Sequence, residues 1–289
     1  MGHSQIAAFA RLADGNVKPV RNIFGQNTQI TRSIHSFAWD PVKDELVVPQ
    51  FHAQAIVFYR ADSNGDVAPT RMIHGPDVKL PNLDNLSIDS VHREVFVGLG
   101  EENEVVVFPL DASGNVAPVR TLKGPDTQLP WSHNTFDVAI DPIHDLMYIS
   151  SGGKILIFNR TDSGNVKPRA VLSAPKNLVR SMGSPTVDPE SGLLFAFYDN
   201  KPRSRSASRV EDGKEINEDY DQHSDDWYLG VWSIFDRGEV APRWTIGGGP
   251  NGIMKDPKGQ VAIDKKRQDV FISDRYTNSL LVYHVPEIF

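Results

Sequence analysis

Short apolar runs that end in an aromatic residue recur along the chain at nearly constant spacing. Their last residues are Phe9, Phe58, Phe108, Phe158, Phe235 and Tyr283. Successive runs therefore lie 49, 50, 50, 77 and 48 residues apart. Pairs of shorter apolar segments lie between them, and turn-forming residues interrupt the pattern too often for a helix of ordinary length. The pattern predicts a repeated unit of about 50 residues that contains four short strands.

After five of the six runs comes a turn with a similar tail. The tails are DGNVKPVR (14–21), NGDVAPTR (64–71), SGNVAPVR (113–120), SGNVKPR (163–169) and RGEVAPR (237–243). Gly supplies the positive φ that a tight turn needs, and Asn or Asp beside it tolerates the same region. Because Pro cannot donate to a β-ladder, we expect the strand at the end of each tail to be the outermost of its sheet.

Each of the five inner strand pairs is joined by a turn that begins with Asp. These residues are Asp40, Asp89, Asp141, Asp188 and Asp264. Five carboxylates at one repeat position could suggest a catalytic ring. Asp side chains, however, commonly cap their own turn by accepting hydrogen bonds from backbone N–H groups. We therefore assign them to turn structure, and we expect His92 and His144 to lie in the same exposed turns, outside any site.

The strand pattern predicts an all-β fold, a β-propeller built from four-stranded antiparallel blades. The repeats contain 21 predicted strands, whereas five blades need 20 and six need 24. Five blades are favoured, with the N-terminal segment pairing with the C-terminal segment so that no sheet edge stays open. One strand is then surplus. A six-bladed propeller with an incomplete last blade is the alternative, and either arrangement makes residues 1–289 a single domain.

The fourth repeat departs from the period, because residues 200–230 add about 27 residues between two of its strands. The first half of this insertion is basic and rich in Ser, and the second half is acidic. A segment with so few apolar residues cannot form a core of its own. We expect an inserted loop within the fourth repeat, which can also serve as a docking arm for a partner.

The repeated tail G-N-V-x-P-x-R and the Asp-initiated turns resemble those of NHL-type and gluconolactonase-like bacterial β-propellers. The resemblance covers residues 6–285 apart from the insertion. It implies the fold more strongly than an activity, because the matching residues are turn and core positions. Propellers of this group include metal-dependent lactonases and lyases as well as binding modules that have no catalytic activity.

Composition and charge exclude several classes of protein. The net charge of −7 argues against a nucleic-acid partner, which normally requires a basic face. No apolar run approaches the length that spans a bilayer. The absence of Cys excludes disulfides and thiolate chemistry. The start MGHSQ lacks the regions of a signal peptide; we nevertheless expect a periplasmic or secreted protein, with the cytoplasm as the alternative.

Polar residues in the connections into the inner strands are expected to converge at the mouth of the central channel. The candidate ligands of one divalent cation there are His35, Asp84, Asn85, His133 and Asp137. Oxygen ligands suit hard cations, and His favours zinc or a transition metal. This set is similar to those of lactonase-like propellers, which implies a metal-dependent hydrolase or lyase with its site at the channel mouth.

No nucleotide-binding loop, zinc-protease helix or nucleophile elbow stands in a suitable context, so catalytic residues stay unknown and no organic cofactor is expected. The favoured function is therefore a non-catalytic, ligand- or protein-binding propeller, with the metal-dependent enzyme as the alternative. Its small-molecule or protein partner is expected at the channel mouth or at the 200–230 loop.

Overall fold

The computed structural model describes residues 4–31, 34, 36–81, 83, 85–131, 136–175, 181–199, 209–211, 214–216, 227–248, 252–257 and 259–289. These residues form two compact units. The first contains residues 1–149 and 158–169, and the second contains residues 150–157 and 170–289.

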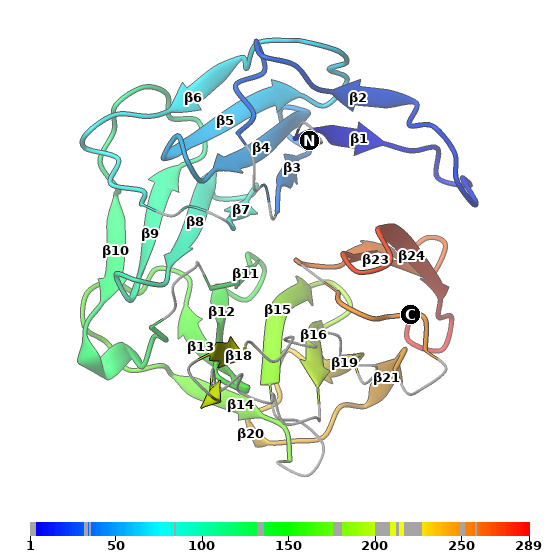
Figure 1. Cartoon of the computed structure of the whole chain (residues 1–289). Helices are drawn as coiled ribbons and strands as arrows, with labels where there is room; N and C mark the ends of the chain where they lie inside the picture. The colour runs from blue at the N-terminus through cyan, green and yellow to red at the C-terminus, as the bar shows by residue number, and fades with distance from the viewer. Residues whose placement is uncertain are drawn as a thin grey trace. The chain divides into compact units, whose positions relative to one another are not determined.

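Two four-stranded antiparallel sheets of the first unit follow the repeat directly (Figure 1). One sheet consists of β3 (Ala38–Asp40), β4 (Glu45–Gln50), β5 (Ala55–Arg60) and β6 (Arg71–Ile73). The next consists of β7 (Ser87–Asp89), β8 (Glu94–Leu99), β9 (Glu104–Pro109) and β10 (Arg120–Lys123). A short 3-10 helix, η1 (Pro125–Thr127), follows β10. The chain order equals the strand order, so each strand hydrogen-bonds to its sequence neighbour.

In the third and fourth sheets the strands also follow the order of the chain, and the third sheet has one additional strand. The third contains β11 (Val138–Asp141), β12 (Leu146–Ser151), β13 (Lys154–Asn159), β14 (Ala170–Ser173) and the two-residue strand β20 (Gly238–Glu239). The fourth contains β15 (Ser181–Asp188), β16 (Leu193–Asp199), β19 (Trp227–Ser233) and β21 (Trp244–Ile246).

The ends of the chain form two smaller sheets. A three-stranded sheet contains β22 (Ala262–Asp264), β23 (Asp269–Asp274) and β24 (Ser279–His284). A two-stranded sheet contains β1 (Ile6–Ala8) and β2 (Arg21–Ile23). The predicted pairing of the two ends of the chain stays a prediction.

The five sheets that have three or more strands are the blades of a five-bladed β-propeller. The predicted all-β fold with five rather than six blades is therefore confirmed. Apart from β17, β18 and β20, which lie outside the repeat pattern, the described strands number 21, as the repeats predict. In each of the four larger sheets, the repeated tail leads to the fourth strand of the blade. This strand is outermost in three of the four sheets. In the third sheet, β20 adds beyond it.

In the first four blades, a fully buried aromatic residue lies near the end of the third strand. In two of these blades it is not the residue that ends the apolar run in the sequence. In the second blade, Phe108 pairs with the second residue of the neighbouring strand. Tyr59 has the equivalent position in the first blade, and Trp232 has it in the fourth. All three are fully buried, whereas Phe235 is 59% exposed. Phe58 is fully buried as well, next to Tyr59, so among these two predicted core residues only Phe235 is wrong. Hydrogen-bond pairing, and not the end of the apolar run, sets the register.

The assignment of the Asp residues to turn structure is confirmed at four of the five turns. The carboxylates of Asp40, Asp89, Asp141 and Asp264 accept hydrogen bonds from backbone N–H groups two or three residues later, at 2.9–3.2 Å. Asp188 instead lies 3.4 Å from the Nζ of Lys265.

Neighbouring repeats are joined by a parallel bridge between the fourth strand of one repeat and the turn Gly of the next. The bridged pairs are Ile23–Gly65, Ile73–Gly114, Leu122–Gly164 and Leu172–Gly238. The predicted positive φ of these Gly residues is confirmed, with values of 70–79°.

The Asn or Asp after each turn Gly has a different role from the one predicted. Asp66, Asn115 and Asn165 do not adopt a positive φ. Their side-chain oxygens instead accept hydrogen bonds at 2.8–2.9 Å from backbone N–H groups of the preceding repeat. The repeated Asn or Asp is therefore a contact between repeats, which only the folded chain brings about.

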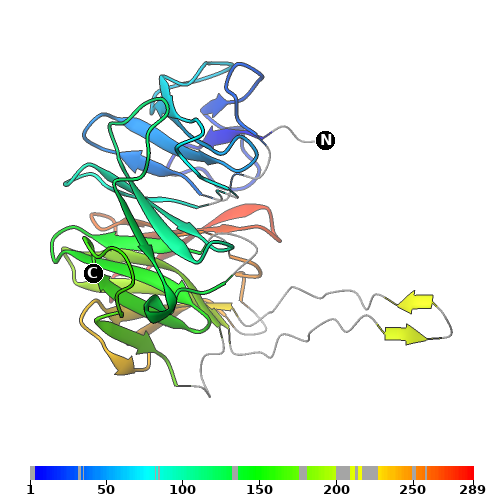
Figure 2. The same cartoon turned by 90° about the vertical axis from the view of Figure 1, so that its left-hand side faces the viewer.

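The insertion lies between β16 and β19 of the fourth blade. It contains a short hairpin, β17 (Arg209–Glu211) with β18 (Lys214–Ile216), which forms a two-stranded sheet of its own (Figure 2). Residues 227–230, the last four of the predicted loop, already pair with β16 as part of β19. The strand β19 is thus longer than the sequence pattern indicates.

Candidate functional site

Only two of the five predicted metal ligands lie within the described part of the chain. His35, Asp84 and His133 fall outside it. Asn85 and Asp137 precede β7 and β11, which pack side by side. Both residues are half-buried, and the side-chain oxygen of Asn85 is buried without a hydrogen-bond partner. The described residues contain no group of three His, Cys, Asp or Glu that could hold a metal ion, so the five-residue site stays a prediction.

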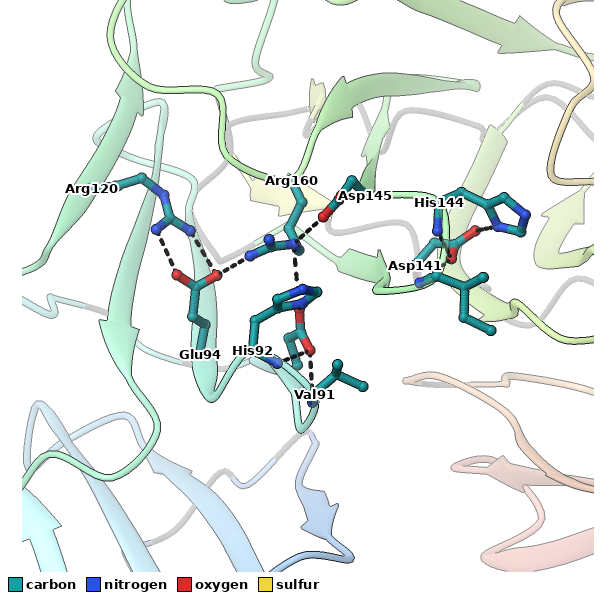
Figure 3. A network of polar contacts seen from close by, with 10 residues as sticks. Val91, His92, Glu94, Arg120, Asp141, His144, Asp145 and Arg160 are labelled. Carbon is teal, nitrogen blue, oxygen red and sulfur yellow. Dashed lines mark hydrogen bonds and ion pairs between the residues drawn. The ribbon is translucent and has the colours of Figure 1, made fainter.

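A network of ion pairs joins the second and third repeats (Figure 3). Glu94 accepts hydrogen bonds from Arg120 at 2.6 and 2.8 Å and from Arg160 at 2.6 Å. Arg160 also donates to Asp145 at 2.9 Å. Burial would raise the pKa of Glu94, but the two guanidinium groups outweigh burial and lower this pKa. The charge of Glu94 is thus compensated within the network, which makes it a structural connection.

Two buried carboxylates in this region each hold a histidine of their own turn (Figure 3). Nδ1 of His92 lies 2.8 Å from Asp89, and Nδ1 of His144 lies 2.8 Å from Asp141. Carboxylates orient imidazole rings in this way at metal and acid–base sites. No third ligand joins either pair within the described residues, and both aspartates also cap their turns. The pairs are therefore part of turn structure, as the sequence indicates.

A pocket of about 340 Å³ lies at one end of the second blade. Two lining residues, Glu102 and Asn103, belong to the turn between β8 and β9. The others follow from the end of β10 through η1, and they are Lys123, Gly124, Pro125, Gln128 and Leu129. The turn and the connection are tied together, because Asn103 Nδ2 donates to the backbone oxygen of Leu129 at 3.3 Å. The pocket therefore has walls from two segments that the fold holds in place.

The carboxylate of Glu102 is the unusual group of this pocket. Its Oε2 atom is buried and has no hydrogen-bond partner. The ammonium of Lys123, which also lines the pocket, lies 2.9 Å from Oε2 of Glu104. A buried carboxylate oxygen without a partner costs free energy, because it has lost water and gained nothing in exchange.

The repeat itself does not require a carboxylate at this position. Residues two places before the third strand are Ala53, Glu102, Gly152 and Thr277 in four of the blades. The turns at Ala53 and Thr277 have the same four-residue length and form with a methyl group or a hydroxyl there, whereas the turn at Gly152 has only two residues. Glu102 was not among the residues that the sequence predicted for a site. The signal that could have found it is this departure from the repeat.

A contact between the second and third repeats positions the connection after β10, which lines the pocket. Gly124 has a φ of 133°, and a Cβ atom built there would lie 2.4 Å from Oδ1 of Asn165. The side chain of Asn165 also bonds to Asp126 in η1, through its Oδ1 at 2.8 Å and its Nδ2 at 3.0 Å. The third repeat thereby holds the connection that lines the pocket of the second.

A scan against protein-family models matches none to this chain, and a search of curated proteins gives no match either. Across the described residues, no helix is long and apolar enough to cross a membrane.

Proposed function

We propose that this protein is a non-catalytic binding propeller that takes a small ligand in the pocket at the end of the second blade. The observation that carries the proposal is the pocket of about 340 Å³, which Glu102 lines together with six other residues of two connected segments. A volume of this order is at the lower end of the range for small-molecule sites. Convergent polar groups in an otherwise partly apolar lining are typical of such sites.

The position of the pocket also supports binding. Turns and connections on a rigid scaffold commonly carry ligand contacts, because they can vary without loss of the fold. Here the scaffold strands β8 and β9 are almost fully buried, while Glu102 differs from its repeat equivalents. Among these equivalents only Glu102 carries a carboxylate, so the shared architecture does not require one there.

The metal-dependent alternative is supported by one described atom. The side-chain oxygen of Asn85 is buried without a hydrogen-bond partner, and amide oxygens are suitable ligands for hard cations. The proposed relation to the NHL-type and gluconolactonase-like group rests on the repeated tail and the Asp-initiated turns. We keep the periplasmic or secreted location as part of the proposal, together with a small-molecule or protein partner.

The experiment that tests the proposal is a fragment screen on the full chain by ligand-detected NMR. Lys123 is exposed at the pocket rim, so the Lys123→Trp variant should cover the pocket with an indole. The matched control is His74→Trp, because His74 is the exposed residue at the same repeat position in the first blade. We expect fragments whose binding is lost in Lys123→Trp and kept in His74→Trp. A library in which no fragment shows this difference would contradict the proposal.

A further inference from the structure

We infer that the ligand of this pocket carries a cationic nitrogen, as in an alkylammonium group, that binds to the carboxylate of Glu102. This inference rests on the proposed function and names the chemical class of its ligand. The carboxylate, the pocket and the ion pair beside it all lie within one blade and the connection that follows it.

The first step concerns the carboxylate in the pocket lining. An ionised carboxylate can only accept hydrogen bonds, so a ligand group that meets the side chain of Glu102 must be a donor. A neutral donor would satisfy the hydrogen bond but leave a negative charge in a partly buried site. A cationic donor supplies both the hydrogen bond and the opposite charge, and such charge-assisted bonds are about twice as strong as neutral ones.

The second step concerns the cation already present. Lys123 lines the same pocket, but its Nζ is held 2.9 Å from Oε2 of Glu104. Glu104 begins β9, where the equivalent residues of other blades are Ala55, Lys154 and Ser279. At the pocket, therefore, one cation accompanies the carboxylates of Glu102 and Glu104, and this cation, Lys123, is paired with Glu104. The carboxylate of Glu102 is left for a cation from outside.

The third step concerns the rest of the ligand. Pro125 and Leu129 contribute apolar wall, and the volume of about 340 Å³ suits a short carbon chain or small ring attached to the nitrogen. Two sources have this chemistry, a free organic amine and the side chain of a lysine in a partner. Their shared feature is an ammonium group on an apolar stem.

The test is calorimetric titration of the full chain with n-butylammonium, with neutral n-butanol as the isostere. We expect n-butylammonium to bind at least about tenfold more tightly than n-butanol. Glu102→Gln should weaken n-butylammonium binding by roughly 10- to 100-fold. Glu101→Gln removes the same charge from the preceding residue, which does not line the pocket, and should change the affinity little. Titration with N-acetyl-lysine-methylamide then separates a lysine side chain from a free amine.

A second variant keeps the inference testable if Glu102→Gln disturbs the turn. Lys123→Met removes the internal cation and should tighten n-butylammonium binding, because the negative charge of Glu104, the partner of Lys123, is then uncompensated beside the pocket. Equal binding of amine and alcohol, or an unchanged amine affinity in Glu102→Gln and Lys123→Met, would overturn the inference. The proposed function survives that result if fragments still distinguish Lys123→Trp from His74→Trp, and fails separately if none does.

Discussion

Asn115 and Asp77 exchange two hydrogen bonds between neighbouring repeats. The backbone N–H of Asp77 donates to Oδ1 of Asn115 at 2.9 Å, and Nδ2 of Asn115 donates to the carboxylate of Asp77 at 2.7 Å. Gly75 makes the approach possible, because a Cβ atom there would lie 2.4 Å from Oδ1 of Asn115. The same arrangement recurs at Gly25 with Asp66 and at Gly124 with Asn165. Gly25, Gly75 and Gly124 thus have no room for a side chain, because the next repeat packs against them.

The first prediction concerns this contact. Asn115→Ala should lower the free energy of unfolding by about 1 kcal/mol, since its bonds are solvent-exposed. Gly75→Ala should cost about 1–3 kcal/mol, because a φ of 142° is strained for Ala and the new Cβ meets Asn115. In the double variant only the clash with the amide group of Asn115 disappears, because the Cβ of residue 115 still lies 2.6 Å from the new Cβ. The two losses should therefore add only in part. The matched control is Gly114→Ala, which has a φ of 77° but open space around the new Cβ. Urea unfolding measures all four proteins, and strictly additive losses would contradict the prediction.

The second prediction concerns the aromatic core. Phe108→Ala and Phe158→Ala should each lower the free energy of unfolding by about 3–5 kcal/mol, because both rings are fully buried. Phe235→Ala is the control, since its ring is exposed and should contribute less than about 0.5 kcal/mol. Chemical denaturation followed by tryptophan fluorescence gives the three values. Losses below 1 kcal/mol at both buried sites would show that the strand faces are misassigned.

The third prediction concerns acid stability. Arg93 donates to Asp40 at 2.8 Å and to Asp111 at 2.6 Å. Burial would raise the pKa of Asp40, but the bonds from Arg93 and from the backbone of Val42 lower it. The bond from Arg93 and the nearby Lys43 lower the pKa of Asp111, against a smaller effect of burial.

Both carboxyl groups therefore have folded-state pKa values below their unfolded values. Their contribution to stability is complete above the unfolded pKa of about 3.9 and is lost as the pH falls through the folded values. We expect the melting temperature to fall below about pH 4. Arg93→Met should be less stable at pH 7 by about 3 kcal/mol, because Asp40 keeps a buried charge without its partner. Its melting temperature should then depend less on pH below 4, and an unchanged acid dependence would contradict the assignment.

The fourth prediction separates the two functions by metal removal. Under the metal-dependent alternative, excess chelator lowers the melting temperature, and added calcium, magnesium, manganese or zinc restores it by mass action. Asp137→Ala and Asn85→Ala should each abolish that shift, because they remove described members of the predicted ligand set. Under the binding proposal the melting temperature does not respond to chelator. A metal-dependent shift that survives both variants would place the ion elsewhere.

Much of the blade structure could be predicted because it is local. Short apolar runs, turn Gly residues and turn Asp residues form strands and turns through contacts within a few positions of one another. The repeat shows this pattern five times. The positive φ of Gly114 and the turn capping by Asp89 need no distant partner. The sequence by itself thus determined the repeated strands, their turns and the propeller fold, with five blades favoured over six.

Only the tertiary structure decided which atoms meet between segments. The register that puts Tyr59 and Trp232 in the core arises from hydrogen bonds between strands, and the partner of Asn115 lies in another repeat. Glu102 is visible in the sequence as a break in the repeat, but the burial of its Oε2 is not. Whether a carboxylate loses its water depends on which distant backbone packs over it, and local pattern carries no information about that.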